Sequence, residues 1–221
     1  MCGRYTLRKT GEIQARFLVN DAPADLAPRY NIAPSERMPV IVQHEENRKI
    51  EVMSWGLVPS WSKEPKPPFS TFNARAEGIA EKPAFRLPIR RRRCLIPADG
   101  FYEWGKTGSR KQPYFIHMRD DRLFAFAGLY DIWHGEGGQE IISYTIITGE
   151  PNDVIAPLHN RMAVILRPED EAEWLDPGVT DPFQVTRLLK PYPADEMDVY
   201  PVSSLVNRAG YDTADMVAPM A

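Results

Sequence analysis

Residues 113–148 read PYFIHMRDDRLFAFAGLYDIWHGEGGQEIISYTIIT. Three runs in this stretch, 113–118, 123–129 and 141–148, are rich in aromatic and β-branched residues. The glycine-rich segment 135–138 forms a turn between the second and third runs. Short runs of this composition, bounded by turn residues, are typical of β-strands. The stretch therefore predicts strands that pair into an antiparallel sheet.

The flanking sequence adds further short strands and a few helices. A polar turn at 44–47 separates two more strand candidates, and residues 60–70, rich in proline and lysine, predict a loop. A helix is expected at 10–19, with Ile13, Phe17 and Leu18 on one face. The remaining expected elements are strands at 38–42, 49–55 and 161–166, a helix starting at Pro168 and ending near 175, and a helix capped by Asp181 and ending near 189.

This pattern predicts an α+β fold with a curled, mostly antiparallel and barrel-like sheet and peripheral helices. The chain has 221 residues, 43% of them hydrophobic, and no linker divides it, so we expect one compact domain over residues 1–221. No apolar run approaches the roughly 20 residues that cross a bilayer, and the first residues lack the regions of a signal peptide. These features predict a cytoplasmic protein, in which Cys2 and Cys94 are thiols rather than a disulfide.

The charge distribution leaves two interpretations open. The net charge of −3 argues against bulk attraction to nucleic acid. A local basic run, formed by Arg86 and residues 90–93, could nevertheless line a groove for phosphates. The same run could equally be a solvated face.

Cys2 carries unusual chemistry if Met1 is removed. An N-terminal cysteine has an amine with a pKa of about 7.7–8.0 and a thiol with a pKa of about 8.5 on adjacent carbons. An aldehyde could react first with the amine, as an imine, and then with sulfur, closing a five-membered thiazolidine. Alternatively, Cys2 is an ordinary residue at a frayed terminus.

Four polar segments, 29–34, 72–77, 97–104 and 158–162, interrupt the apolar runs. They offer an amide, a carboxylate and an imidazole, the groups that imine chemistry needs for proton transfer. The aromatic neighbours of Glu103 could desolvate its carboxylate and raise its pKa. Taken singly, each has a structural alternative: Glu103 at a strand edge, Asn73 capping a turn, His159 as a structural group, and Arg75 paired with Glu77 on the surface.

Several common classes of site are disfavoured. Cys2, Cys94, Asp99 and His159 include donor types for zinc, but their spacing matches no zinc motif. The chain also lacks a glycine-rich phosphate loop and the G-x-S-x-G elbow of serine hydrolases. We therefore expect neither a metal nor a cofactor.

Six segments in order resemble the successive motifs of the SOS-response-associated peptidase (SRAP) family of abasic-site processing proteins. The resemblance covers core motifs over residues 2–166, and residues 168–205 correspond to C-terminal helices and a closing strand. The segments are MCGRYT (1–6), RYNIAPS (29–35), MSWGLVPSW (53–61), FNARAE (72–77), CLIPADGFYEW (94–104) and LHNRMAVIL (158–166).

The resemblance implies a reversible thiazolidine crosslink between Cys2 and an abasic site in single-stranded DNA. Asn73 would position the amine, Glu103 would act as acid and base, and His159 would serve the sugar's ring oxygen and proton transfer. The resemblance places DNA-binding residues at Arg4, Asn31, Trp61 and Arg75. It implies a DNA-repair protein that associates with the nucleoid when bound to DNA. Nothing in the sequence demands more than a monomer, which is the state we expect.

Two alternatives remain at this stage. One is an N-terminal cysteine hydrolase or peptidase, in which Glu103 or His159 serves as the base for attack on an amide. The other is a single-stranded DNA-binding module in which Cys2 takes no part.

Overall fold

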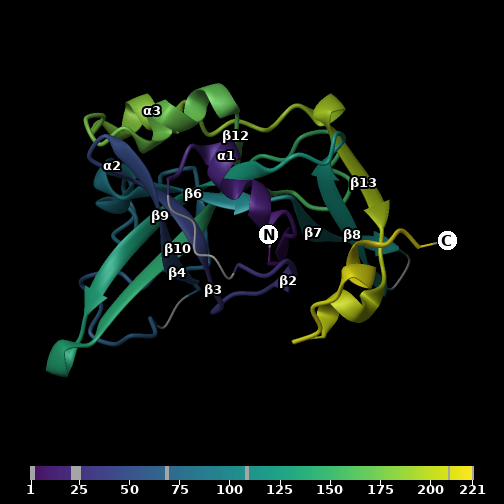
Figure 1. The fold of residues 1–221 in the computed structure, drawn as a ribbon, viewed down its shortest axis with the longest axis horizontal. Helices are drawn as coiled ribbons and strands as arrows, with labels where there is room; N and C mark the ends of the chain where they lie inside the picture. The colour runs from purple at the N-terminus through teal and green to yellow at the C-terminus, as the bar shows by residue number, and fades with distance from the viewer. Residues whose placement is uncertain (1–2, 21–25, 68–69, 108–109, 209, 221) are drawn as a thin grey trace.

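The computed structural model describes residues 3–20, 26–67, 70–107, 110–208 and 210–220. Five strands of the larger sheet close into a barrel, because β10 pairs with β4 on one edge and with β9 on the other (Figure 1). The order around the barrel is β10-β4-β3-β6-β9. These strands are β3 (Arg37–His44), β4 (Asn47–Trp55), β6 (Arg93–Ala98), β9 (Phe124–His134) and β10 (Glu140–Gly149).

Three short strands extend the barrel. β5 (Asn73–Arg75) runs parallel to β10, and β11 (Met162–Ala163) runs antiparallel to β10. β12 (Ile165–Leu166) pairs instead with β9. The single strand predicted at 161–166 is therefore wrong in detail: the segment passes from one barrel strand to the other and breaks between the two pairings.

The second sheet has five strands in the order β13-β8-β7-β1-β2. Its central β7–β8 hairpin brings the 97–104 motif next to the 113–118 run that predicted a strand. The members are β1 (Tyr5–Leu7), β2 (Arg29–Ile32), β7 (Gly100–Thr107), β8 (Arg110–Met118) and β13 (Met197–Pro201).

Tyr5 of β1 joins the two sheets. Its ring packs edge-on against Trp55 and Phe126, with centroids 5.2 and 6.0 Å away. Its hydroxyl lies 2.8 Å from that of Tyr144 on β10, within hydrogen-bonding distance. Because Tyr5 is fully buried, strand β1 is fixed to the barrel as well as to its own sheet.

Short helices lie at the periphery, as predicted (Figure 1). Trp174 of α3 is buried, and its indole donates a hydrogen bond to the carbonyl of Cys94 on β6, 3.0 Å away. Asp181 accepts from the backbone N–H of Phe183, which confirms the predicted cap. No helix in the described ranges is long and apolar enough to span a membrane. The α-helices are α1 (Ile13–Phe17), α2 (Pro88–Arg91), α3 (Glu171–Leu175) and α4 (Pro182–Thr186).

The face predicted for the first helix is wrong at one residue. Ile13 and Phe17 are buried, but Leu18 is 75% exposed. Leu18 has a φ of +56°, so the helix ends there in a left-handed residue and its side chain turns away from the buried face. Hydrophobic spacing alone could not show where the helix stops.

A buried carboxylate fixes the position of β1. Asp99, with no exposed surface, accepts hydrogen bonds from the Thr6 hydroxyl at 2.6 Å and from the backbone N–H of Lys9 at 2.9 Å. It also accepts from the backbone and the guanidinium of Arg8. Three residues at the end of β1 are thus bound to one side chain between β6 and β7.

We expect Asp99→Asn to lower the free energy of unfolding by about 3 kcal/mol, because the new amide NH₂ would face backbone donors and leave Arg8 without its buried partner. Urea denaturation measures the loss. Asp120→Asn is the matched control, since Asp120 is exposed and pairs with Arg122 at the surface; its cost should stay below about 1 kcal/mol. Equal losses in the two variants would contradict the role assigned to Asp99.

Candidate active site

Glu103 lies on β7 and is 1% exposed. Burial raises the pKa of its carboxyl, because the charged form loses hydration. Its neighbour Tyr102 packs on the other face of the strand, against Phe115. The raised pKa agrees with the prediction, but its expected cause does not, because the aromatic neighbours of Glu103 lie on the opposite face of β7. Glu103 is buried rather than exposed at a strand edge.

His159 ends the turn 152–159 and is partly buried. The backbone N–H of Arg161 donates to its Nδ1 at 3.0 Å, so the neutral ring carries its proton on Nε2. The carbonyl of Arg161 is also 3.2 Å from Nδ1, but the shorter contact comes from a group that can only donate. Burial lowers the pKa of His159, and the cations of Arg161 and Lys111 lower it further. The ring is accordingly neutral at pH 7.

Gly105 allows the His159 turn to approach β7. A Cβ atom at this position would lie 2.8 Å from Cδ2 of Leu158 and 3.0 Å from the ring of Tyr114. Because side chains alternate along a strand, Gly105 and Glu103 share one face of β7. Leu158, adjacent to His159, therefore covers the face of β7 that carries Glu103.

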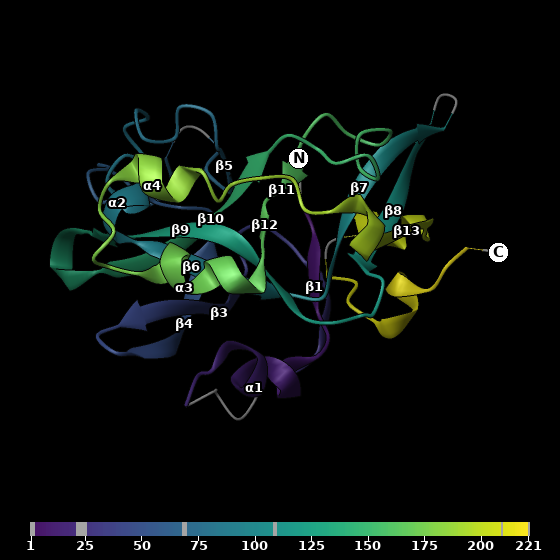
Figure 2. The ribbon, with the colours of Figure 1, turned by 90° about the horizontal axis from the view of Figure 1, so that it is seen from above.

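Asn73 and Arg75 occupy one face of β5, which pairs with β10 in register Ile146 to Asn73 and Thr148 to Arg75. Asn73 is partly buried and Arg75 is exposed. Asn73 is thus a strand residue, not the cap of a turn. Figure 2 shows β5, β11 and β7 along the same side of the molecule, opposite α1.

Arg161 connects the segment that follows β5, and strand β10, to the His159 turn. Its guanidinium forms a two-point ion pair with Glu77, with both distances 2.8 Å, and also bonds the carbonyl of Thr148. The Arg161 guanidinium holds the pKa of Glu77 below its usual range. Glu77 therefore pairs with Arg161 rather than with Arg75, its expected partner.

Strand β1 pairs with β7, the strand that carries Glu103. Tyr5 pairs with Phe101 and Thr6 with Gly100, and the N–H of Tyr102 donates to the carbonyl of Arg4. This register, continued by two positions, sets Gly3 opposite Glu103. Cys2, the predicted nucleophile, lies outside the described residues.

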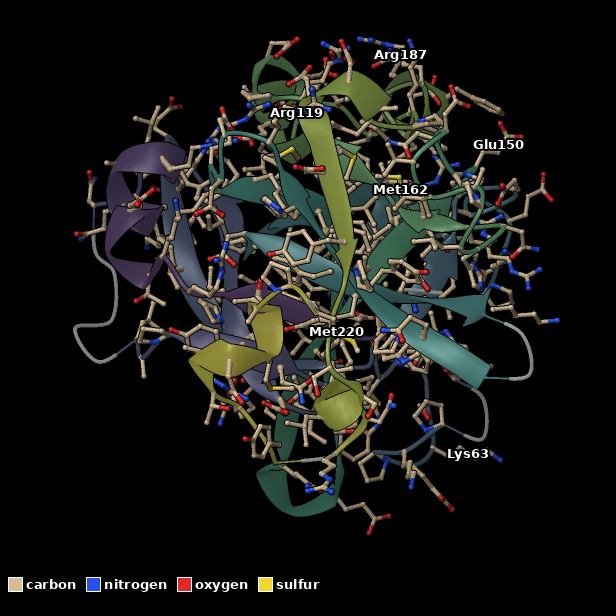
Figure 3. All side chains as sticks on the ribbon, turned by 90° about the vertical axis from the view of Figure 1, so that its right-hand side faces the viewer. Lys63, Arg119, Glu150, Met162, Arg187 and Met220 are labelled. Atoms are coloured by element: carbon tan, nitrogen blue, oxygen red, sulfur yellow. The ribbon has the colours of Figure 1, made fainter. Side chains whose placement is uncertain are left out.

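Asn31 is 3% exposed, and its amide organises the neighbouring chain. Its Oδ1 accepts from the guanidinium of Arg4 at 3.0 Å, and its Nδ2 donates to the carbonyl of Tyr211 at 2.8 Å. The Asn31 amide is therefore positioned to orient the Arg4 guanidinium. Figure 3 shows the C-terminal segment crossing in front of the second sheet as far as Met220, whose N–H donates to Pro201.

Trp61 is 56% exposed, and the polar edge of its indole is held by the carbonyl of Pro83 at 3.2 Å. Its loop is anchored on both sides: Asp131 accepts from the N–H of Ser60, and the indole of Trp133 donates to the carbonyl of Ser62. A large ring is thus fixed at the surface. Trp55 is instead buried in the barrel.

The basic run does not form one continuous groove. Arg93 is 5% exposed and donates to the backbone carbonyls of Ile89 and Trp174. Arg92 pairs with the buried carboxylate of Asp131. The sequence could not show this division, because consecutive residues at a helix-to-strand junction point in different directions.

The match to known proteins now decides the family. The model of the family described as SOS response associated peptidase (SRAP) matches residues 1–209. The chain belongs to the SRAP family. Abasic site processing protein YoqW of Bacillus subtilis is 42% identical, over 98% of this chain and 99% of its own. Abasic site processing protein HMCES of Mus musculus is 34% identical, over 99% of this chain and 76% of its own.

Solved structures agree with this SRAP fold. A protein from Bacteroides thetaiotaomicron superposes with a TM-score of 0.88 at 28% identity, and all of both chains is covered. A phage-related protein from Bordetella bronchiseptica has a TM-score of 0.72 at 31% identity, covering 91% of this chain and 94% of its own. In the described part of our SRAP chain, no three His, Cys, Asp or Glu side chains gather as a metal site would require.

The sequence did not indicate the importance of two residues of this SRAP site, Arg161 and Gly105. Arg161 lies in the LHNRM segment but was not singled out, and its contacts with Glu77 and His159 depend on the β10–β11 pairing. Gly105 follows the FYEW motif directly, and only the approach of Leu158 shows that a side chain there would be crowded.

We expect Gly105→Ala to displace the Leu158 side chain and, through it, the adjacent His159 ring. The displaced ring should lose part of its burial, so the pKa of His159 should rise toward its usual value. A pH titration of the imidazole signals by NMR measures this change. Gly11→Ala is the control, because its new Cβ would meet nothing within 4 Å. An unaltered His159 titration in Gly105→Ala would refute the link between the two segments.

Proposed function

We propose that this protein processes abasic sites in single-stranded DNA by forming a covalent, reversible thiazolidine through Cys2 after removal of Met1. The observation that carries the proposal is the buried Glu103 with a raised pKa, on the strand that pairs with β1 just after Cys2. The names of YoqW and HMCES, abasic site processing proteins, support the choice of lesion.

The proposed reaction balances as aldehyde plus N-terminal cysteine giving thiazolidine plus water. The amine of Cys2 adds to the aldehyde carbon of the ring-opened sugar and forms a carbinolamine. Glu103, as a carboxylic acid, gives its proton to the departing hydroxyl, which leaves as water and produces an imine. The Glu103 carboxylate takes back the N–H proton of the carbinolamine as the imine forms. The sulfur of Cys2 then adds to the imine carbon and closes the ring, while the proton of its thiol passes to the nitrogen through Glu103 or water.

Asn73 and His159 have supporting roles in this proposal. Asn73, on β5 beside β10, would hold the amine of Cys2 in position for attack. The neutral His159 ring carries its proton on Nε2 and would donate it in a hydrogen bond to the sugar's ring oxygen as the ring opens. The reverse of these steps would release the DNA.

Binding of the DNA strand rests on cations and one exposed ring. Arg4, oriented by Asn31, and the exposed Arg75 would hold phosphates beside the lesion. Trp61, fixed with its ring exposed, would stack on a base. The aldehyde, rather than a base sequence, would select the target.

An N-terminal cysteine hydrolase would use the same groups differently. It would need a base to activate the thiol, but the neutral Nδ1 of His159 already accepts a hydrogen bond and Glu103 has a raised pKa. The Nδ1 atom of His159 is therefore not available as that base, and the raised pKa of Glu103 favours its protonated form. Release of an amine from a peptide substrate, without any DNA adduct, would support the hydrolase.

The test of the proposal is incubation with an oligonucleotide that bears one abasic site, followed by denaturing electrophoresis. Wild type should form a band of retarded mobility, and Cys2→Ala should form none. A variant with one uncleaved residue before Cys2 should also fail, because its amine is then an amide. Cys94→Ala is the control and should crosslink normally, since Cys94 is buried and burial raises the pKa of its thiol. An adduct in Cys2→Ala would disprove the mechanism.

Glu103→Gln should slow adduct formation about 100-fold, because the amide cannot give up a proton. The wild-type rate should also show an ionisation above the usual carboxyl pKa of about 4.3, since burial raises that of Glu103. The acid is present below this pKa and is lost as pH rises through it, so this step should vanish from the variant's pH–rate profile. Single-strand affinity should persist; if it collapses with the rate, Glu103 is structural.

A further inference from the structure

Trp61 lies in a tight turn whose shape is fixed by its own hydrogen bonds. The N–H of Ser62 donates to the carbonyl of Pro59 at 2.8 Å and closes the turn 59–62. The Ser62 hydroxyl donates to the carbonyl of Glu64 at 2.7 Å, which fixes the chain beyond the turn as well. The exposed ring of Trp61 is therefore carried by an ordered segment.

Strand β9 holds this turn on both sides of Trp61. Oδ2 of Asp131 accepts from the backbone N–H of Ser60 at 2.8 Å. The indole of Trp133 donates to the carbonyl of Ser62 at 2.7 Å. Asp131 and Trp133 are two positions apart, so they share one face of the strand. The residues immediately before and after Trp61 are thus bound to one face of a barrel strand.

The loop that carries this turn is also attached beside the candidate active site. It starts after Leu57 and ends before Thr71, and the N–H of Leu57 donates to the carbonyl of Thr71 at 3.3 Å. The indole of Trp55 donates to the carbonyl of Phe72 at 2.8 Å, directly before Asn73 on β5. Both ends of the loop are therefore fixed next to a strand of the site.

Asp131 is the buried side chain that connects the turn to the barrel. It is 2% exposed. Its Oδ1 accepts from the guanidinium of Arg92 and from the N–H of Ile132, whereas its Oδ2 binds Ser60. A buried ion pair contributes little to stability compared with apolar residues of the same size. What the carboxylate adds is a second acceptor, which reaches the turn while the first is occupied by Arg92.

We propose that Asp131 is a positioning residue for DNA binding. By holding Ser60, it fixes the Trp61 ring in the orientation in which the ring stacks on a base beside the abasic site. This proposal rests on the proposed function and adds the residue on which base stacking depends. A ring that is already fixed in the unbound protein loses less conformational freedom when it stacks, so binding is tighter. Trp61 contacts the base, and Asp131 acts only through Trp61.

The experiment measures equilibrium binding to a single-stranded oligonucleotide that contains a tetrahydrofuran abasic analogue. The analogue has no aldehyde, so the result does not depend on the reaction of Cys2. Trp61→Ala should weaken binding about 10-fold, the loss of one base stacked on an aromatic ring. Asp131→Asn should weaken it about 5-fold, because the amide has a single acceptor oxygen and its NH₂ group would face the donor of the turn, which frees the ring.

A double-mutant cycle separates this role from a structural one. In the Trp61→Ala background, Asp131→Asn should cause no further loss of affinity, since Asp131 acts through the ring that is already absent. A comparable loss in both backgrounds would overturn the proposal. The removal of a negative charge by itself favours binding to DNA, so a loss of affinity in Asp131→Asn is not an effect of net charge.

Glu171→Gln is the matched control. Glu171 of α3 is also a 2% exposed carboxylate and pairs with Arg16, so its loss removes the same charge and a similar buried ion pair. Glu171→Gln should leave the affinity for the analogue unchanged. An equal weakening in Glu171→Gln and Asp131→Asn would overturn the proposal, because general destabilisation would then explain both.

Ser60→Pro tests the same contact without changing Asp131. Proline removes the N–H that Asp131 accepts, and it suits the second position of a turn. The ion pair of Asp131 with Arg92 remains, so the melting temperature should fall less than in Asp131→Asn while DNA affinity still decreases. Wild-type affinity in Ser60→Pro would overturn the proposal. Failure of the wild type itself to bind the analogue would instead overturn the proposed function, on which this role of Asp131 rests.

Discussion

The whole site depends on the fixation of strand β1, and the carboxylate of Asp99 provides it. This buried group satisfies donors from Thr6, Arg8 and Lys9, while Tyr5 reaches into the barrel to contact Tyr144. A strand of three residues has too few ladder bonds to hold its own register. The proposed chemistry needs the N-terminal amine at one place beside Glu103. A terminus can have such precision only if the residues just after it are immobilised, which Asp99 and Tyr5 do from opposite sides of β1.

The sequence predicted the strands well because their signal is local. The runs at 113–118, 123–129 and 141–148 each became part of a strand, since aromatic and β-branched residues fit a buried pleated surface wherever the partner lies. Closure of the barrel was harder to predict from the sequence, because it depends on the parallel pairing of β10 with β4, two strands that are far apart in the chain. The errors have the same origin. Leu18 belongs to the helical pattern but ends the helix in a left-handed conformation, and residues 161–166 pair with two different strands.

The candidate active site was likewise predicted in its local features and not in its long-range contacts. The motifs indicated Glu103, His159 and Asn73, and the aromatic neighbours of Glu103 indicated its burial; the roles of all three remain predictions. What the motifs could not show is which polar groups meet. Glu77 pairs with Arg161, and Asn31 orients Arg4 while bonding the C-terminal segment. Both links join segments far apart in the chain, and neither residue's type specifies its partner. The proposed role of Arg4 therefore depends on a buried amide that is distant from it in the sequence.

Burial acts on Glu103 and His159 in opposite directions, with a consequence for the proposed chemistry. It raises the pKa of the acid and lowers that of the imidazole, because in each case the charged form is the one that loses hydration. Both shifts favour the neutral forms, a carboxylic acid and an imidazole with its proton on Nε2. Each neutral form is a donor, and each oxygen that must leave or open in imine formation needs a donor. The cations Arg161 and Lys111 add to the effect of burial on His159, so positive charge near the ring also favours its neutral form.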